Sequence, residues 1–243
     1  SYTCTNHFID MLDGWALKTG FRIGNGSSGT IVDCHGNWTY WIVNGGSQST
    51  LPGQVQAPVL DFVSHNLEMY VFGNCRELMV KDFSIIEKTY MRLMDENGAG
   101  PNVTLINNYC DASIQGYVLD AAAPGSTLDA VNSPITAFNF GNYSDQAQAT
   151  VTVLSTTNFQ GTARFENAVQ WGGNYLDLNV NGGNVIMAGY HTDNGAARGS
   201  IVNGGVLHLI NASLSVSGNT TRWELTPCSI RMRRSSTESI PMA

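Results

Sequence analysis

The chain has 243 residues, of which 42% are apolar and 13% are charged, and this balance excludes a disordered segment and a coiled coil. The formal net charge of −7 at pH 7 excludes the basic surface that nucleic-acid binding requires. No apolar run reaches the roughly 20 residues that cross a bilayer. We therefore expect a globular protein whose partners are neither nucleic acid nor membrane.

The N-terminal half shows short strands separated by turn-forming residues. The whole chain contains 26 glycines, which favour non-helical backbone and indicate an all-β fold. Thr30–Asp33 reads as a strand, and Gly45–Pro58, rich in Gly, Ser, Gln and Pro, as a loop that leaves the sheets. Leu78 and Val80, followed by Asp82, recur 25 residues later as Val103, Leu105 and Asn107.

The middle of the chain contains two less regular segments. Ile86–Glu96 fits either a helix or a strand followed by a turn. Leu119–Pro134 contains an Ala-Ala-Ala-Pro-Gly run and is expected to form a second loop that borders the same groove as Gly45–Pro58. Function commonly resides in such loops on a rigid framework.

The C-terminal half repeats itself every 22 residues. Three columns share this offset: Ala163, Val185 and Leu207; Phe165, Met187 and Leu209; and Asn167, Gly189 and Asn211. Because neighbouring columns are two residues apart, they predict the inward face of a short strand that recurs once per repeat. Repeats of 22 to 25 residues predict a single domain spanning 1–243 with about ten turns.

These repeats, together with strands that end in Asn, resemble the pectin-lyase-like right-handed parallel β-helix superfamily. Leu209-Ile210-Asn211 and Gly29–Cys34 carry the resemblance. It implies a single-stranded right-handed parallel β-helix and an exported, carbohydrate-active protein. The superfamily includes pectate lyases, polygalacturonase-like glycosidases, tailspikes and adhesins. The usual N-terminal Val-x-x-Pro-x-Gly-x-Tyr segment and capping helix are missing, which favours the C-terminal portion of a longer β-helix or an unusual cap.

Glycoside hydrolysis requires two carboxylates roughly 5 to 9.5 Å apart, and neighbouring strands lie about 4.8 Å apart. Carboxylates on neighbouring turns can meet this requirement. The candidate catalytic residues are Asp61, Asp111, Asp120 and Asp129. Turn capping by aspartate is the alternative interpretation for each of them.

Aromatic residues precede the first loop and could stack on sugar rings. Trp38, Tyr40 and Trp41 are the candidate substrate-binding residues there, with an internal aromatic stack as the alternative. His35 and His191 could bind sugar or transfer protons, or could be structural turn residues.

Metals and cofactors are not expected. The five cysteines form no C-x-x-C pair, which argues against zinc and favours burial in a β core. A lyase would need a cation and a base; the available basic residues are Arg76, Lys81, Arg164 and Arg198, without a carboxylate cluster for Ca²⁺.

The resemblance therefore implies an extracellular or periplasmic glycoside hydrolase that acts on a polysaccharide or oligosaccharide, and we expect it to need no metal or cofactor. A polysaccharide lyase is the second hypothesis. A non-catalytic structural, adhesive or glycan-binding module is the third.

Overall fold

The computed structural model describes residues 3–14, 16–37, 53–139, 143–192, 199–212, 224–225 and 231–233. Their strands form two sheets in which every pair of neighbouring strands is parallel. The all-β expectation is confirmed at this level, with one α-helix and one short 3₁₀ helix among the described residues.

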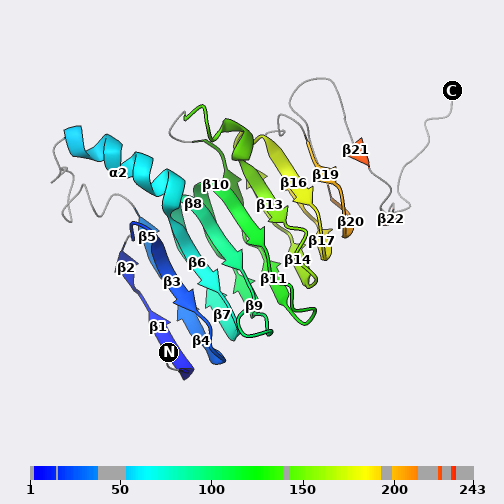
Figure 1. Cartoon of the computed structure of the whole chain (residues 1–243), viewed down its shortest axis with the longest axis horizontal. Helices are drawn as coiled ribbons and strands as arrows, with labels where there is room; N and C mark the ends of the chain where they lie inside the picture. Colours follow the sequence, from blue (N-terminus) through cyan, green and yellow to red (C-terminus); the bar gives the residue numbers. More distant parts are fainter. Residues whose placement is uncertain are drawn as a thin grey trace.

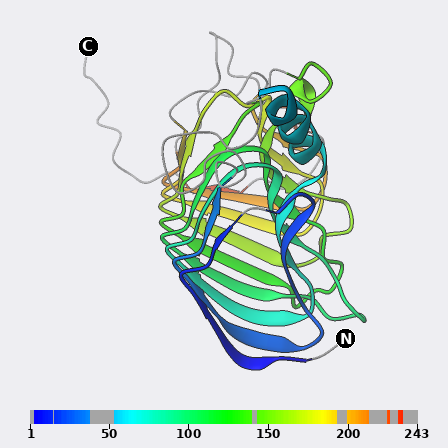
Figure 2. The same cartoon turned by 90° about the vertical axis from the view of Figure 1, so that its left-hand side faces the viewer.

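The first sheet has nine strands that lie side by side in chain order (Figure 1). They are β1 (Thr5–Asp10), β4 (Ser27–Val32), β7 (Cys75–Val80), β9 (Asn102–Ile106), β11 (Thr127–Val131), β14 (Thr162–Glu166), β17 (Asn184–Ala188), β20 (Val206–Ile210) and β22 (Arg231–Arg233). We call this the nine-stranded sheet. Its strands form a regular ladder from one end of the molecule to the other (Figure 2).

The second sheet supplies the opposite walls of the core. Its strands are β2 (Asp13–Gly14), β3 (Thr19–Ile23), β5 (His35–Asn37), β6 (Glu68–Phe72), β8 (Phe83–Leu93), β10 (Tyr109–Leu119), β12 (Ile135–Ala137), β13 (Val151–Ser155), β15 (Val169–Trp171), β16 (Leu176–Val180), β18 (His191–Thr192), β19 (Ile201–Val202) and β21 (Glu224–Leu225). The segment Ile86–Glu96, which the sequence left open, lies mostly in strand β8.

The long strands β8 and β10 each span the length of two shorter ones. The first half of β8 pairs with β5 and its second half with β6, while β10 pairs in the same way with β12 and β13. Ile86 and Ala112 lie between the two halves with positive φ angles of 67° and 60°. In β8 and β10, a single residue with positive φ therefore connects the two halves of the strand. In other repeats, a longer segment connects the two corresponding short strands.

Residues with positive φ also follow most strands of the nine-stranded sheet. These corner residues, with φ between 49° and 62°, are Met11, Asp33, Lys81, Asn107, Asn132, Asn167, Gly189 and Asn211. Each of the first seven donates its backbone N–H to the last carbonyl of the next strand, as Asn107 does to Val131 (3.0 Å). The Asn167 column is thus a corner column and not part of the inward strand face that the sequence pattern suggested.

The number of residues between successive corner residues shows where extra segments are inserted into the repeats. Most intervals are 22 to 26 residues, but those from Asp33 to Lys81 and from Asn132 to Asn167 are 48 and 35. The first contains α2 (Gly53–Asn66), and the second contains residues 138–150 with the 3₁₀ helix η1 (Ala147–Ala149). Both lie between the two short strands of a repeat, and α2 lies outside the sheets (Figures 1 and 2).

The predicted loop Leu119–Pro134 is therefore wrong, because this segment contains strand β11 and spans an ordinary interval. Its Ala-Ala-Ala-Pro-Gly run occupies only the tight connection before β11. The helix α2 begins within the predicted loop Gly45–Pro58, whose residues 45–52 lie outside the described part of the chain.

The C-terminal repeat is confirmed residue by residue. Phe165 pairs with Met187 and Met187 with Leu209, and the Ala163, Val185 and Leu207 column is in register beside them. The side chains of both columns are buried, except for Leu209, which is partly buried against the same core.

The upstream alignment is wrong by one residue. Met79 pairs with Leu105 and Glu77 with Val103, so the offset is 26 and not 25. A shift of one residue exchanges the two faces of a strand. Leu78 and Val80 therefore face outward, and Glu77 occupies the inward column that carries Val, Leu and Ala in later strands.

The core is one continuous cluster of apolar side chains that runs from Ile31 to Leu207. Three of the four described cysteines are buried in β structure, as expected, while Cys4 is exposed. The rings of Tyr70, Tyr90, Tyr117 and Phe165 follow one another along the stack with centroid distances of 5.0 to 5.6 Å.

Buried carboxyl groups interrupt this apolar core. The Tyr70 hydroxyl donates to Asp82 (2.6 Å), the Ser84 hydroxyl to Glu87 (3.0 Å), and the Tyr190 hydroxyl to Asp177 (2.7 Å). Burial raises the pKa of Asp82 to about 8 and the pKa values of Glu87 and Asp177 to about 7.

The raised pKa of Asp82 predicts a fold that loses stability as the pH rises. Its folded-state pKa exceeds the unfolded value of about 3.9, so the stabilisation is complete below that value and is lost progressively toward about pH 8. Asp82→Asn cannot ionise and should flatten the pH dependence of the free energy of unfolding by up to about 1.4 kcal/mol per pH unit. Urea titrations between about pH 4 and 8 measure this slope. Exposed Asp129→Asn is the control, and equal slopes in wild type and Asp82→Asn would contradict the expectation.

Candidate functional site

The structure places the four candidate catalytic aspartates on different elements. Asp61 lies on α2, Asp111 within β10, Asp120 just after β10, and Asp129 on the outer face of β11. No hydrogen bond or ion pair among the described residues joins any two of them. A catalytic pair drawn from this set therefore gains no support from geometry and stays a prediction.

Asp120 is engaged in a network between neighbouring strands. Its Oδ1 accepts hydrogen bonds from the Thr156 hydroxyl (2.6 Å) and the Asn158 amide (3.2 Å). Arg92 lies 3.5 Å from Oδ2 and also donates to Glu68 (2.6 Å). These contacts tie the end of β10 to the strands on either side, which is a structural role.

The other candidates are dispersed in the same way. Burial raises the pKa of Asp111, which has no partner among the other three. The His35 ring lies between Asp13 (3.4 Å) and Asp33 (3.3 Å), and His191 is an exposed residue at the start of β18. Trp38, Tyr40 and Trp41 lie outside the described residues.

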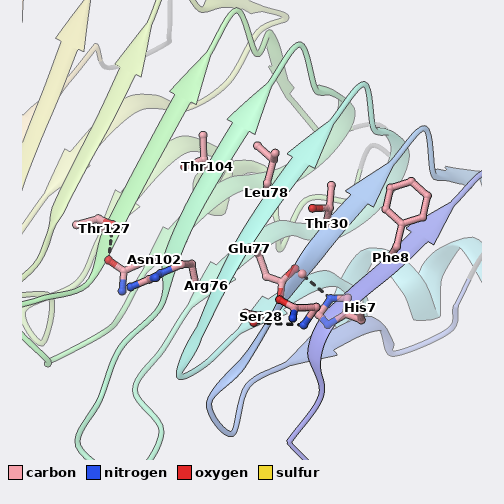
Figure 3. Close-up of a pocket in the computed structure, with 12 residues that line it drawn as sticks. His7, Phe8, Ser28, Thr30, Arg76, Glu77, Leu78, Asn102, Thr104 and Thr127 are labelled. Atoms are coloured by element: carbon pink, nitrogen blue, oxygen red, sulfur yellow. Dashed lines mark hydrogen bonds and ion pairs between the residues drawn. The ribbon is translucent and has the colours of Figure 1, made fainter.

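An open groove of about 780 Å³ crosses the N-terminal half of the nine-stranded sheet. Its lining comes from five successive strands, β1, β4, β7, β9 and β11 (Figure 3). The groove therefore runs across the strands, along the direction in which they stack. Four strand spacings of about 4.8 Å give it a length of roughly 19 Å.

Two rows of outward side chains line this groove (Figure 3). The polar row is Ser28, Arg76, Asn102 and Thr127, which follow one another in register. The second row is Phe8, Thr30, Leu78 and Thr104, also in register. One side of the groove thus offers hydrogen-bonding groups, and the other offers methyl groups and an aromatic ring.

Individual residues of these rows differ in character. Arg76 is exposed and makes no salt bridge among the described residues. The Thr127 hydroxyl donates to Asn102 Oδ1 (2.9 Å), which fixes that amide in the polar row. Phe8, 66% exposed, presents its ring at the β1 end of the groove.

His7 and Glu77 form a pair at the β1 end of the groove. His7 Nε2 lies 3.1 Å from Glu77 Oε2, although strand β4 separates their two strands. A register irregularity between Thr5 and His7 accompanies this contact. The imidazole lies against Gly29, where any β-carbon would overlap the ring. Glycine on the intervening strand therefore lets His7 reach Glu77.

The environment of Glu77 is unusual for a carboxylate. Its side chain is fully buried, and Oε1 has no hydrogen-bond partner. Burial raises the pKa of Glu77 to about 7, while His7 opposes this increase. A buried carboxyl group with a raised pKa thus lies beneath the groove.

Sequence reasoning missed this arrangement because the upstream alignment was one residue out of register. An offset of 26 would have placed Glu77 in the Val103 column, where a charged residue is an anomaly. Arg76 was considered only as a possible lyase base, and Phe8 was not considered.

No protein-family model matches the sequence, and neither a curated protein nor a solved structure matches it. Within the described ranges, no group of three or more His, Cys, Asp or Glu side chains is arranged to hold a metal ion. None of the helices described is long and apolar enough to span a bilayer.

Gly29→Ala tests the contact between His7 and Glu77. The added methyl group should displace the imidazole and leave both oxygens of a buried carboxyl without a partner, at a cost of roughly 1–3 kcal/mol in unfolding free energy. Gly14→Ala is the matched control, because a β-carbon there meets nothing within 4 Å. Urea unfolding of both variants provides the comparison. Equal losses would show that the His7 contact carries no stability.

Proposed function

We propose that the chain is a right-handed parallel β-helix that binds an extended carbohydrate in the groove of the nine-stranded sheet. The repeated corners and the two parallel sheets with strands in matching order support the β-helix. Parallel strands joined by crossovers follow the right-handed sense in about 98% of cases, which supports the handedness.

The direction of the groove is the observation that carries the proposed ligand. A site that crosses five strands in register offers side chains at regular intervals of about 4.8 Å, which suits an extended polymer better than a compact metabolite. A length of roughly 19 Å accommodates several sugar rings.

The chemistry of the two rows supports a carbohydrate over other polymers. Sugar rings present hydroxyl groups at their edges and C–H groups on their faces. The amide and hydroxyl groups of the polar row can donate to and accept from hydroxyls. Phe8 and Leu78 provide apolar surface for the ring faces. The net charge of −7 disfavours a nucleic acid in the same groove.

Binding to a panel of soluble polysaccharides, measured by calorimetry, tests this function. Phe8→Ala and Arg76→Ala should each weaken binding of the best ligand about tenfold, equivalent to about 1.4 kcal/mol. Arg164→Ala, on β14 of the same sheet and outside the groove, should bind like wild type. Absence of binding across the panel, or equal affinities in all three variants, would refute the assignment.

Hydrolysis of the bound glycan is the second candidate function. The observation that favours it is the place of Glu77 in the lining of the groove, in contact with His7, where burial raises the pKa of its carboxyl group to about 7. Glu77→Gln keeps the side chain's size and should lower the release of reducing ends by about 10²-fold, with little change in glycan affinity. Asn variants of the four candidate aspartates belong in the same assay as alternative sources of the acid. Full activity in Glu77→Gln would remove Glu77 from this role.

A further inference from the structure

The two insertions meet beside the second sheet. Val63 of α2 and Leu67, the residue that follows the helix, are both fully buried, and Ile86 of β8 lies against them. Residues 143–150, from the second insertion, contact the same end of the helix. Gln146 Nε2 donates to the Ser64 carbonyl (2.8 Å), and the Tyr143 ring meets the His65 ring edge-on at 5.6 Å.

Both ring nitrogens of His65 have a partner, and the Nε2 contact joins the two insertions. Nδ1 lies 2.7 Å from the Asp61 carbonyl oxygen, and Nε2 lies 2.8 Å from Asp145 Oδ2. The Ser64 hydroxyl also lies near Nδ1 but directs its own proton to the Asp61 carbonyl (2.8 Å). A neutral imidazole has one N–H and can donate to only one of these acceptors, whereas an imidazolium donates to both.

We propose that His65 and Asp145 form a pH-dependent clasp that fastens the end of α2 to residues 143–150 when His65 is protonated. The clasp goes beyond the proposed carbohydrate function, because it lies on the inserted segments and not on the nine-stranded sheet. Loss of the proton removes the ion pair and leaves one N–H for the two acceptors. The contact between the two insertions is then weaker and depends more on the Gln146 hydrogen bond and the Tyr143 ring contact.

The charged groups around the clasp all favour the protonated state. Asp145 faces His65 from the second insertion, and the Asp61 carboxylate lies 3.6 Å from Nδ1 on the helix itself. Tyr143, the other titratable neighbour, is kept neutral because burial raises its pKa. His65 is also in the last turn of α2, where the helix dipole favours a cation.

The pKa shifts define the pH range in which the clasp is closed. The hydrogen bond with Asp145 raises the pKa of His65 above its usual value, so this stabilisation is present below about pH 6.5 and is lost as the pH rises through the folded-state pKa. The same contact lowers the pKa of Asp145, so its contribution is lost only when the pH falls well below about 4. The clasp is therefore closed at mildly acidic pH and opens at both extremes.

An NMR titration of the His65 ring tests the clasp in the intact chain. Asp145→Asn should lower the apparent pKa of His65 toward about 6.5. The matched control is Asp13→Asn, which removes a carboxylate from a different histidine, His35, and should leave the His65 titration unchanged. An unchanged His65 pKa in Asp145→Asn would overturn the proposal.

Hydrogen exchange provides the second measurement. Protection factors for residues 62–66 should be several-fold higher at about pH 5.5 than at about pH 8.5 in wild type, and His65→Gln and Asp145→Asn should both lose this difference. A wild-type chain without this difference, or variants that retain it in full, would show that His65 does not control the contact.

Discussion

The backbone hydrogen bond at the corners of the nine-stranded sheet, made by the corner residues from Met11 to Gly189, is the interaction on which the other features depend. A corner residue with positive φ donates its N–H to the carbonyl that ends the next strand, and this contact repeats along the sheet. The left-handed region favours Asn, Asp and Gly, which occupy six of the eight positions; Met11 and Lys81 are the exceptions. Because the corner fixes where each strand ends, it also decides which side chains point inward.

This dependence explains how much of the fold the sequence could reveal. In the C-terminal half, Asn167, Gly189 and Asn211 mark the corners at a constant spacing, so the inward columns were identified correctly. Upstream, Lys81 occupies the corner and Asp82 follows it, so the residue that looks like a turn former is buried inside. Taking Asp82 for the corner shifts the whole strand by one residue.

The candidate site could not be predicted from the sequence for the same reason, the error in register, and for a second reason. The register error turned Glu77 outward, where a carboxylate attracts no notice. The contact of His7 with Glu77 also depends on Gly29, which lies between them and has no side chain to block it. A single sequence does not show which glycine leaves room for such a contact. The four candidate aspartates were chosen for their number and spacing in the sequence. In the structure, the elements that carry or adjoin them, α2, β10 and β11, belong to three different surfaces.

The junction between the two short strands of a repeat differs in length from one repeat to another, while the strands of the nine-stranded sheet keep their pairing. In β8 and β10 it is a single residue, Ile86 or Ala112, whereas elsewhere it holds 30 residues between Asn37 and Glu68, or 13 between Ala137 and Val151. The nine-stranded sheet stays in register across both insertions. A junction of one residue and a junction of 30 residues are thus compatible with the same pairing of the strands that form the groove, so the length of the inserted segment and the shape of the groove are independent features of this fold.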